Sequence, residues 1–269
     1  MAVKIVEHPL TGQQFRMGRK MPTSTPSRKL RLSTYKVKYD YPKVVDYAEK
    51  ARTALGRMYL NDQIGCCVVA GMAHLLGVYT GNSTGVPIIL TNAEIRRVYS
   101  AISGYDGSTA TDNGCDEAEA LEYWRKKGIA GRKIVDHVAI DGSDPDEVRM
   151  AIWLFGGIMS GTALPNAWVD PMPRRTGFVF DVAGDPVPDN GHCMVHCGYD
   201  ANKKRINVST WGMVGSVTDA AVQRYMTSAA GGELHAILSK DVIATGKKKA
   251  PNGLDWDRLE RDWKQIDWG

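Results

Sequence analysis

The order of hydrophobic and polar positions divides the chain into a helix-rich first half and a strand-rich second half. Residues 67–79 are almost wholly apolar and small, which predicts a helix buried on most of its faces. Apolar spacing and capping residues predict further helices over 42–60, 91–103, 116–127, 143–155 and 218–227. Short apolar runs predict strands over 133–140, 158–164, 193–198, 205–211 and 233–238. Because the two kinds of element are segregated rather than alternating, the pattern predicts an α+β fold.

The two ends of the chain differ from its centre. Residues 1–45 contain ten Lys or Arg and two acidic residues, a net charge of +8, whereas the remainder carries −4. We therefore predict a basic, extended N-terminal arm over 1–45, one domain over 46–245, and a helical tail over 246–269 with an amphipathic helix at 256–266. We expect such an arm to dock along its own body or on a partner in an assembly.

The composition is typical of a soluble globular protein, with 43% hydrophobic and 24% charged residues. No apolar run approaches the roughly 20 residues that span a bilayer, so no membrane partner is predicted. The first 30 residues lack the apolar core of a signal peptide, which argues against export. Five cysteines cannot all pair within one chain, and together with the missing signal this favours a reducing compartment.

A cysteine pair opens the apolar helix predicted over 67–79. A thiol at a helix N-terminus lies next to unpaired backbone N–H groups and the positive end of the helix dipole, which favour a thiolate. Cys66 and Cys67 both compete for this role. Cys67 is preferred because it directly precedes the apolar run. The structural alternative is that both are small buried residues.

His192 is the second candidate catalytic residue. It lies 125 residues after Cys67 and begins a predicted strand. Alternation places His192, Met194 and His196 on one face and the intervening residues on the other. An imidazole from such a strand could deprotonate the thiol of Cys67. The run is also dense in zinc-ligand atoms, but a strand cannot direct neighbouring residues at one ion and no Cys-x-x-Cys pair follows. No metal or cofactor is therefore predicted.

These segments resemble the papain-like cysteine peptidase superfamily over about residues 58–240. The resemblance is carried by Gly65-Cys66-Cys67, Asn113-Gly114-Cys115, the helix and strand of 148–164, the run 191–200, and Ser209-Thr210-Trp211-Gly212. It implies a helical left subdomain that carries the cysteine helix and a β-sheet right subdomain that carries the histidine strand. It also implies that Cys67 is the nucleophile and His192 the general base and then acid. The Cys67 N–H would supply half of the oxyanion hole.

The sequence departs from the family pattern at four places. Ser209 stands where the family has the Asn that orients the imidazole, and Asn61 holds the spacing of the oxyanion-hole Gln, while Gln63 lies two positions too close. Glu117-Ala118 replaces the Gly-Gly that lines the family's substrate cleft, and Val68 replaces a bulky aromatic. A carboxylate at position 117 would reject many peptide side chains or prefer basic ones.

A closer likeness is to uncharacterised papain-like proteins of tailed bacteriophages and prophages. The shared phrases include Asn61-Asp62, 111–114, 154–157 and 251–253. The leading hypothesis is a phage-encoded thiol hydrolase that acts on peptide or protein substrates. The alternative is a catalytically weak or inactive virion structural or decoration protein whose residues 1–45 bind neighbouring virion proteins. Both place the chain on a virion or in the host cytoplasm. A DNA-binding arm is a third reading, which the lack of interleaved aromatics disfavours.

Overall fold

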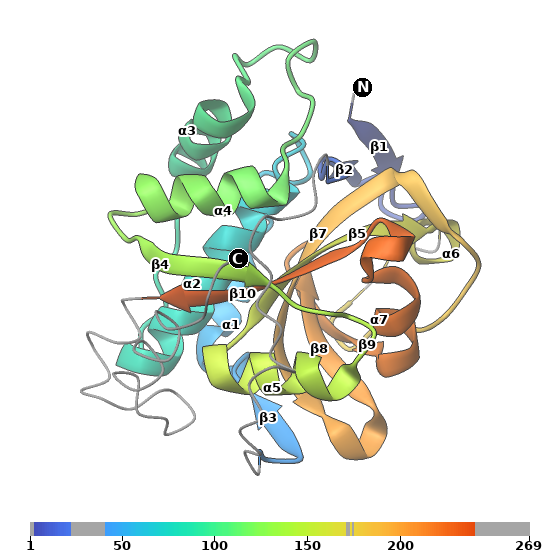
Figure 1. Ribbon diagram of the computed structural model, residues 1–269. Coiled ribbons are helices and arrows are strands. Elements are labelled where there is room, and N and C mark those ends of the chain that lie inside the picture. The colour runs from blue at the N-terminus through green and yellow to red at the C-terminus, as the bar shows by residue number, and fades with distance from the viewer. Residues whose placement is uncertain (1–2, 23–40, 171–172, 174, 240–269) are drawn as a thin grey trace.

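The computed structural model of the chain describes residues 3–22, 41–170, 173 and 175–239 (Figure 1). Within these ranges a set of helices and one large sheet form a mixed α+β structure, as the sequence predicts. The tail predicted over 246–269 lies outside the described residues, and so does the predicted helix at 256–266.

The sheet has eight strands in the order β4-β10-β5-β7-β8-β9-β6, with β3 paired to β7. The strands are β3 (Val44–Asp46), β4 (Ile134–Ala139), β5 (Ile158–Pro165), β6 (Val179–Phe180), β7 (Pro186–Asp200), β8 (Arg205–Thr210), β9 (Met213–Thr218) and β10 (Glu233–Ser239). β7 is the central strand because it pairs antiparallel with β3, β5 and β8. It is longer than the strand predicted over 193–198, since it begins at Pro186 and ends at Asp200.

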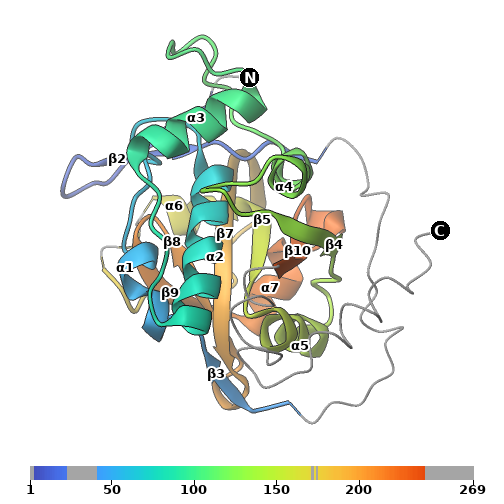
Figure 2. The same ribbon diagram turned by 90° about the vertical axis from the view of Figure 1, so that its left-hand side faces the viewer.

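Helices cover both faces of this sheet. The helical segments that precede β4 are η2 (Glu49–Ala51), α1 (Arg52–Leu55), α2 (Cys67–Thr84), α3 (Asn92–Ser103) and α4 (Glu117–Lys126). The remaining helical segments are α5 (Pro145–Phe155), η3 (Ala201–Lys203), α6 (Asn166–Val169), α7 (Asp219–Tyr225) and η4 (Ser228–Ala230). Figure 2 shows α2 on one side of β7 and β5, with α5 and α7 on the other.

The predicted helix over 42–60 is wrong at both ends, since α1 stops at Leu55 and the first residues form a strand. Val44 and Val45 are β-branched, and they form β3, in which Val45 pairs with Tyr199 of β7. Helical structure begins only at Glu49. Pairing with the central strand therefore overrides the helical spacing of the apolar residues.

The buried helix α2 holds its first turn against β7 through a close approach. A Cβ at Gly71 would lie 2.9 Å from the Sγ of Cys193, so glycine lets the helix backbone come this near to the sheet. Gly71 lies one turn after Cys67. The sequence thus fixes the cysteine end of α2 beside the histidine strand.

Part of the predicted N-terminal arm is paired rather than simply extended. β1 (Lys4–Glu7) and β2 (Gln14–Met17) form an antiparallel hairpin, with Ile5 opposite Arg16. The chain then continues along the domain to residue 22. None of the helices in the described parts of the chain combines the length and apolarity that a membrane crossing requires.

A capping box is present at the start of α3, where the capping residues of the sequence predict a helix. It is expected to contribute to the stability of the fold. The Thr91 hydroxyl accepts a hydrogen bond from the Glu94 N–H, and the Glu94 carboxylate accepts one from the Thr91 N–H. Thr91→Ala is expected to lower the free energy of unfolding by about 1 kcal/mol. Urea unfolding measures this, with the exposed Asn92→Ala as matched control. Equal loss in both variants would contradict the capping role.

Candidate functional site

Cys67 is the first residue of α2 and is almost fully buried, with 1% of its surface exposed. The helix has no side-chain N-cap, so the N–H groups of its first turn are left for other partners. The backbone N–H groups of Cys193 and Gly18 point at the Cys67 sulfur and lower its pKa. The thiol therefore lies in a cradle of backbone donors.

Cys66 is directed elsewhere. Its Sγ donates to the backbone carbonyl of Tyr59 at 3.1 Å, and burial raises the pKa of its thiol well above the ordinary value. Of the two cysteines that the sequence offers, Cys67 is the one whose sulfur meets the strand of His192.

His192 lies in β7 and its ring is fixed on two sides. The Nε2 atom is 2.7 Å from the Thr210 hydroxyl, and the ring stacks on Trp211 with 4.4 Å between centroids. The Nδ1 atom is buried and has no hydrogen-bond partner. If Nε2 carries the proton and donates to Thr210, Nδ1 keeps a free lone pair, which is the form a general base needs.

The Cys67 sulfur lies against the backbone of the strand that carries His192, but it makes no hydrogen bond to the imidazole. The sulfur lies at the N–H of Cys193, the residue that follows His192. Burial raises the pKa of Cys67 to about 11, against the opposing effect of the two N–H groups. Burial, with a smaller effect from His74, lowers the pKa of His192 to about 3. Both groups are therefore neutral at pH 7 in this structure.

Ser209 does not orient the imidazole, which corrects the role predicted for it. Its hydroxyl is buried without a hydrogen-bond partner, and Thr210 makes the bond to His192. The reason is strand alternation. Ser209 pairs with Val195, whose side chain packs toward Gly71 of α2, so the next residue, Thr210, lies on the opposite face together with His192.

Asn61 is buried at the edge of the site and binds a peptide backbone. Its side-chain Nδ2 donates to the backbone carbonyl of Arg16 at 3.0 Å. The backbone carbonyl of Asn61 accepts from the Arg16 N–H, also at 3.0 Å. Gln63, the other residue considered, is exposed. The amide is thus occupied by Arg16, and the oxyanion-hole role of Asn61 stays a prediction.

Residues 16–21, the covering segment, lie across Cys67. The Gly18 carbonyl accepts from the Cys115 N–H at 2.9 Å, and the Arg19 N–H donates to the Gly191 carbonyl at 3.1 Å. A Cβ at Gly18 would lie 1.8 Å from the Gly65 carbonyl oxygen, so only glycine fits there. Sequence reasoning considered an arm docked on its own body, but no motif in the sequence placed it over the thiol.

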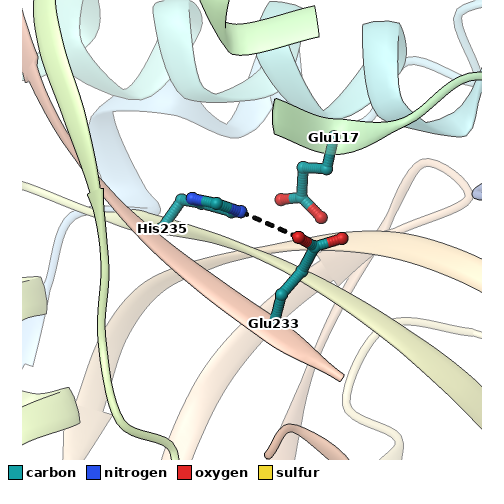
Figure 3. A group of neighbouring side chains, drawn as sticks. All are labelled: Glu117, Glu233 and His235. Atoms are coloured by element: carbon teal, nitrogen blue, oxygen red, sulfur yellow. Dashed lines mark hydrogen bonds and ion pairs between the residues drawn. The ribbon is translucent and has the colours of Figure 1, made fainter. Parts of the chain in front are cut away.

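A cluster of ionisable side chains lies beside the covering segment. Figure 3 shows the carboxyl groups of Glu117 and Glu233 turned toward each other, with His235 bound to Glu233. One ligand atom from each of the three lies within 4.8 Å of the others, and this is the only such group of three among the residues with described positions. These atoms suit a divalent cation by type. The Arg19 guanidinium, however, already binds Glu233 at 2.7 Å.

The site thus joins a cysteine at a helix N-terminus to a histidine on the central strand of a large sheet. No protein-family model and no curated protein matches the sequence. The structure is similar to solved cysteine proteases. The chain has the papain-like fold. Its similarity to a procathepsin B of Trypanosoma congolense has a TM-score of 0.58 at 12% identity, over 83% of this chain and 86% of that one.

Two further structures agree with this papain-like fold. Procathepsin L2 from the larval midgut of Tenebrio molitor has a TM-score of 0.56 at 10% identity, covering 88% of this chain and 84% of the other. Xylellain, a cysteine protease from Xylella fastidiosa, has a TM-score of 0.50 at 13% identity over 65% and 80%. The helical part that carries Cys67 and the sheet that carries His192 are the two halves of the papain-like architecture that the sequence predicted.

Proposed function

We propose that this protein is a papain-like thiol hydrolase that cleaves peptide bonds, with Cys67 as nucleophile and His192 as general base. The observation that carries the proposal is the position of the Cys67 sulfur. It lies at the N-terminus of α2 and meets the backbone of β7 directly after His192. The structural neighbours named as cysteine proteases share this arrangement of helix and sheet at the level of the fold.

The chemistry follows from the groups present. Nδ1 of His192, which has no partner, takes the thiol proton, and the sulfur attacks the carbonyl carbon of the substrate. The Asn61 amide and the N–H of Cys67 stabilise the oxyanion. The C–N bond breaks as the imidazolium returns its proton to the leaving amine. Water, deprotonated by His192, then cleaves the thioester and releases the acid.

The described conformation is a closed form of this enzyme. The covering segment excludes substrate because it hydrogen-bonds on one side to Cys115 and on the other to Gly191. Several of the similar structures are proforms by name, including the procathepsins and the Amb a 11 proform. We propose that residues 16–21 must leave the cleft before hydrolysis begins.

A peptidyl vinyl sulfone tests the proposal directly. Its double bond accepts the sulfur at the β-carbon and the thiol proton at the α-carbon, which leaves a stable thioether. The full chain carrying Gly18→Val is used, because a Cβ at Gly18 would lie 1.8 Å from the Gly65 carbonyl oxygen and displaces the covering segment. Incubation of this variant should give one adduct per molecule on Cys67, located by mass spectrometry, and peptide hydrolysis should disappear in parallel. Adducts spread over other cysteines, with hydrolysis unaffected, would refute the catalytic assignment.

Thr210 is expected to act as a positioning residue for His192. Thr210→Val removes the hydroxyl bound to Nε2 while keeping the volume and should lower kcat/KM about tenfold, with little change in KM. Ser209→Ala should change kcat/KM less than twofold, because its hydroxyl has no partner. The pH profile of kcat/KM should also shift in Thr210→Val only. Equal losses in the two variants would contradict this role.

A second candidate function is a non-catalytic structural protein of a phage particle. One observation favours it: the thiol and imidazole are both neutral and make no hydrogen bond to each other. The phage-like phrases of the sequence supply the proposed setting, on a virion or in the host cytoplasm. The proposal expects a fixed copy number in purified particles, measured by quantitative mass spectrometry. Detection only as free protein in the lysate would eliminate it.

A further inference from the structure

A buried arginine occupies a side-chain pocket next to Cys67. The Arg19 side chain is fully buried, and its Nε and Nη2 donate to the same Glu233 oxygen at 3.1 and 2.7 Å. Its Nη1 donates to the Gly231 carbonyl at 2.9 Å. The three donor nitrogens of the guanidinium are therefore all used, which is characteristic of a pocket shaped for a planar, forked cation.

Glu117 adds an acceptor that nothing else in the described chain satisfies. It comes from the first turn of α4, is fully buried, and neither carboxyl oxygen has a hydrogen-bond partner. Figure 3 shows its carboxyl group turned toward Glu233 across the pocket. A buried carboxyl without a partner is costly, so its retention here points to a polar ligand.

The floor of the pocket is a glycine that makes room for the cation. A Cβ at Gly161 of β5 would lie 2.4 Å from the Arg19 Nε and 2.5 Å from a Glu117 oxygen. Any larger residue would fill the space that the guanidinium uses. The pocket is thus built from three separate elements: α4, β5 and β10.

The guanidinium of Arg19 supplies a positive charge directly against the Glu233 carboxylate, at 2.7 Å. Burial raises the pKa of Glu117 well above its ordinary value and the charge of Glu233 raises it further, whereas the charge of Arg19 lowers it. Burial opposes ionisation of Glu233, but the hydrogen bond from His235 and the charge of Arg19 lower its pKa. His235 Nε2 lies 3.1 Å from the second Glu233 oxygen and leaves the first for the guanidinium. An apolar side chain in place of Arg19 would leave the first Glu233 oxygen without its two guanidinium donors.

We infer that this pocket is a specificity pocket of the peptide-binding cleft and that it selects an arginine side chain of the substrate. In the closed form, Arg19 of the covering segment takes that place. The N–H of Gly18, the residue before Arg19, lies at the Cys67 sulfur. The residue that fills the pocket therefore directly follows the one that contacts the reacting sulfur. That the bound arginine belongs to a substrate rests on the proposed hydrolase function. That the pocket recognises a guanidinium group does not depend on this function.

The first experiment tests the pocket without any need for activity. Arg19→Ala in the full chain should lower the melting temperature, and millimolar ethylguanidinium should restore part of the loss. Ethylammonium at the same concentration should restore much less, and neither cation should act on Arg19→Ala/Glu233→Gln. Equal effects of the two cations, or no effect of either, would overturn the inference. If Arg19→Ala does not fold, Arg19→Gln is tested with the same pair of cations.

The second experiment tests the substrate with a peptide library that carries arginine, lysine or citrulline at each position. Citrulline keeps the shape of arginine but has no charge. At one position kcat/KM should be at least about tenfold higher for arginine than for citrulline, and Glu233→Gln should abolish the difference. Hydrolysis without this preference overturns the inference and leaves the proposed function intact. Cation rescue without hydrolysis of any peptide refutes the hydrolase and leaves the guanidinium pocket.

Discussion

Replacement of Cys67 by alanine is expected to reduce kcat/KM for peptide hydrolysis by at least about 10⁴-fold. The loss is large because the nucleophile itself is removed, and the thiols of Cys66 and Cys193 are engaged elsewhere. The Cys66 thiol is bound to the Tyr59 carbonyl, and the Cys193 sulfur packs against Gly71 in the helix–sheet contact. Removal of a nucleophile leaves only the contributions of binding and of the oxyanion donors.

Two matched variants make this measurement specific. Cys66→Ala removes a sulfur of the same size and burial, one residue away, and should keep kcat/KM within about threefold of the wild type. Circular dichroism should show the same fold for both alanine variants. Hydrolysis that survives in Cys67→Ala would mean that another group attacks the substrate, and the catalytic assignment would fall.

Displacement of the covering segment is expected to increase the alkylation rate of Cys67 about 300-fold at pH 7. Burial raises the pKa of Cys67 to about 11 in the closed form, whereas an exposed thiol has a pKa of about 8.5. The thiolate is the reactive species, and its fraction at pH 7 rises by the ratio of the two acid constants. Gly18→Val should cause the displacement, because a Cβ at this position would lie 1.8 Å from the Gly65 carbonyl oxygen.

The pH dependence of alkylation gives an independent check. In the wild type the rate should rise about tenfold per pH unit up to about pH 11, since the neutral thiol persists below its raised pKa. In Gly18→Val the rate should level off at a lower pH. Gln14→Val, an exposed change in the same hairpin, is the control and should follow the wild type. Identical profiles for all three proteins would show that the segment does not set the state of the thiol.

The elements with strong local signals could be predicted from the sequence. The capping box of Thr91 and Glu94 starts α3 as expected, and the apolar run after Cys67 forms the buried helix α2. The segregation of helices and strands gave the correct fold class. The start of the first predicted helix failed, because the pairing of Val45 with Tyr199 is a contact between residues far apart in the chain.

The parts of the candidate site that depend on local sequence signals could be predicted. A helix start and a strand were enough to single out Cys67 and His192 as candidates, but the partner of His192 depends on the register of a hairpin. Alternation had already placed His192 and Cys193 on opposite faces, and the same rule separates Ser209 from Thr210. Without the pairing of Val195 with Ser209, that rule could not be applied.

The covering segment and the arginine pocket were beyond sequence analysis for a different reason. Glu117 was noted as a carboxylate in the substrate cleft that would prefer basic side chains. The two residues that lie beside it in the pocket, Arg19 and Glu233, come from opposite ends of the chain, and nothing local links them. Their meeting depends on hydrogen bonds of the backbone to Cys115 and Gly191, which carry no side-chain signature.

The long strand β7 has a consequence for how this protein should respond to heat. Its backbone is paired on both flanks, with Val195 opposite Met159 of β5 on one side and Ser209 of β8 on the other. Amide hydrogens in such a strand exchange with solvent only when the whole molecule opens, whereas those of a peripheral hairpin exchange through local fluctuations. His192 should therefore stay in position until the domain unfolds globally. Moderate heating should release the covering segment at a lower temperature than the one at which β7 unfolds.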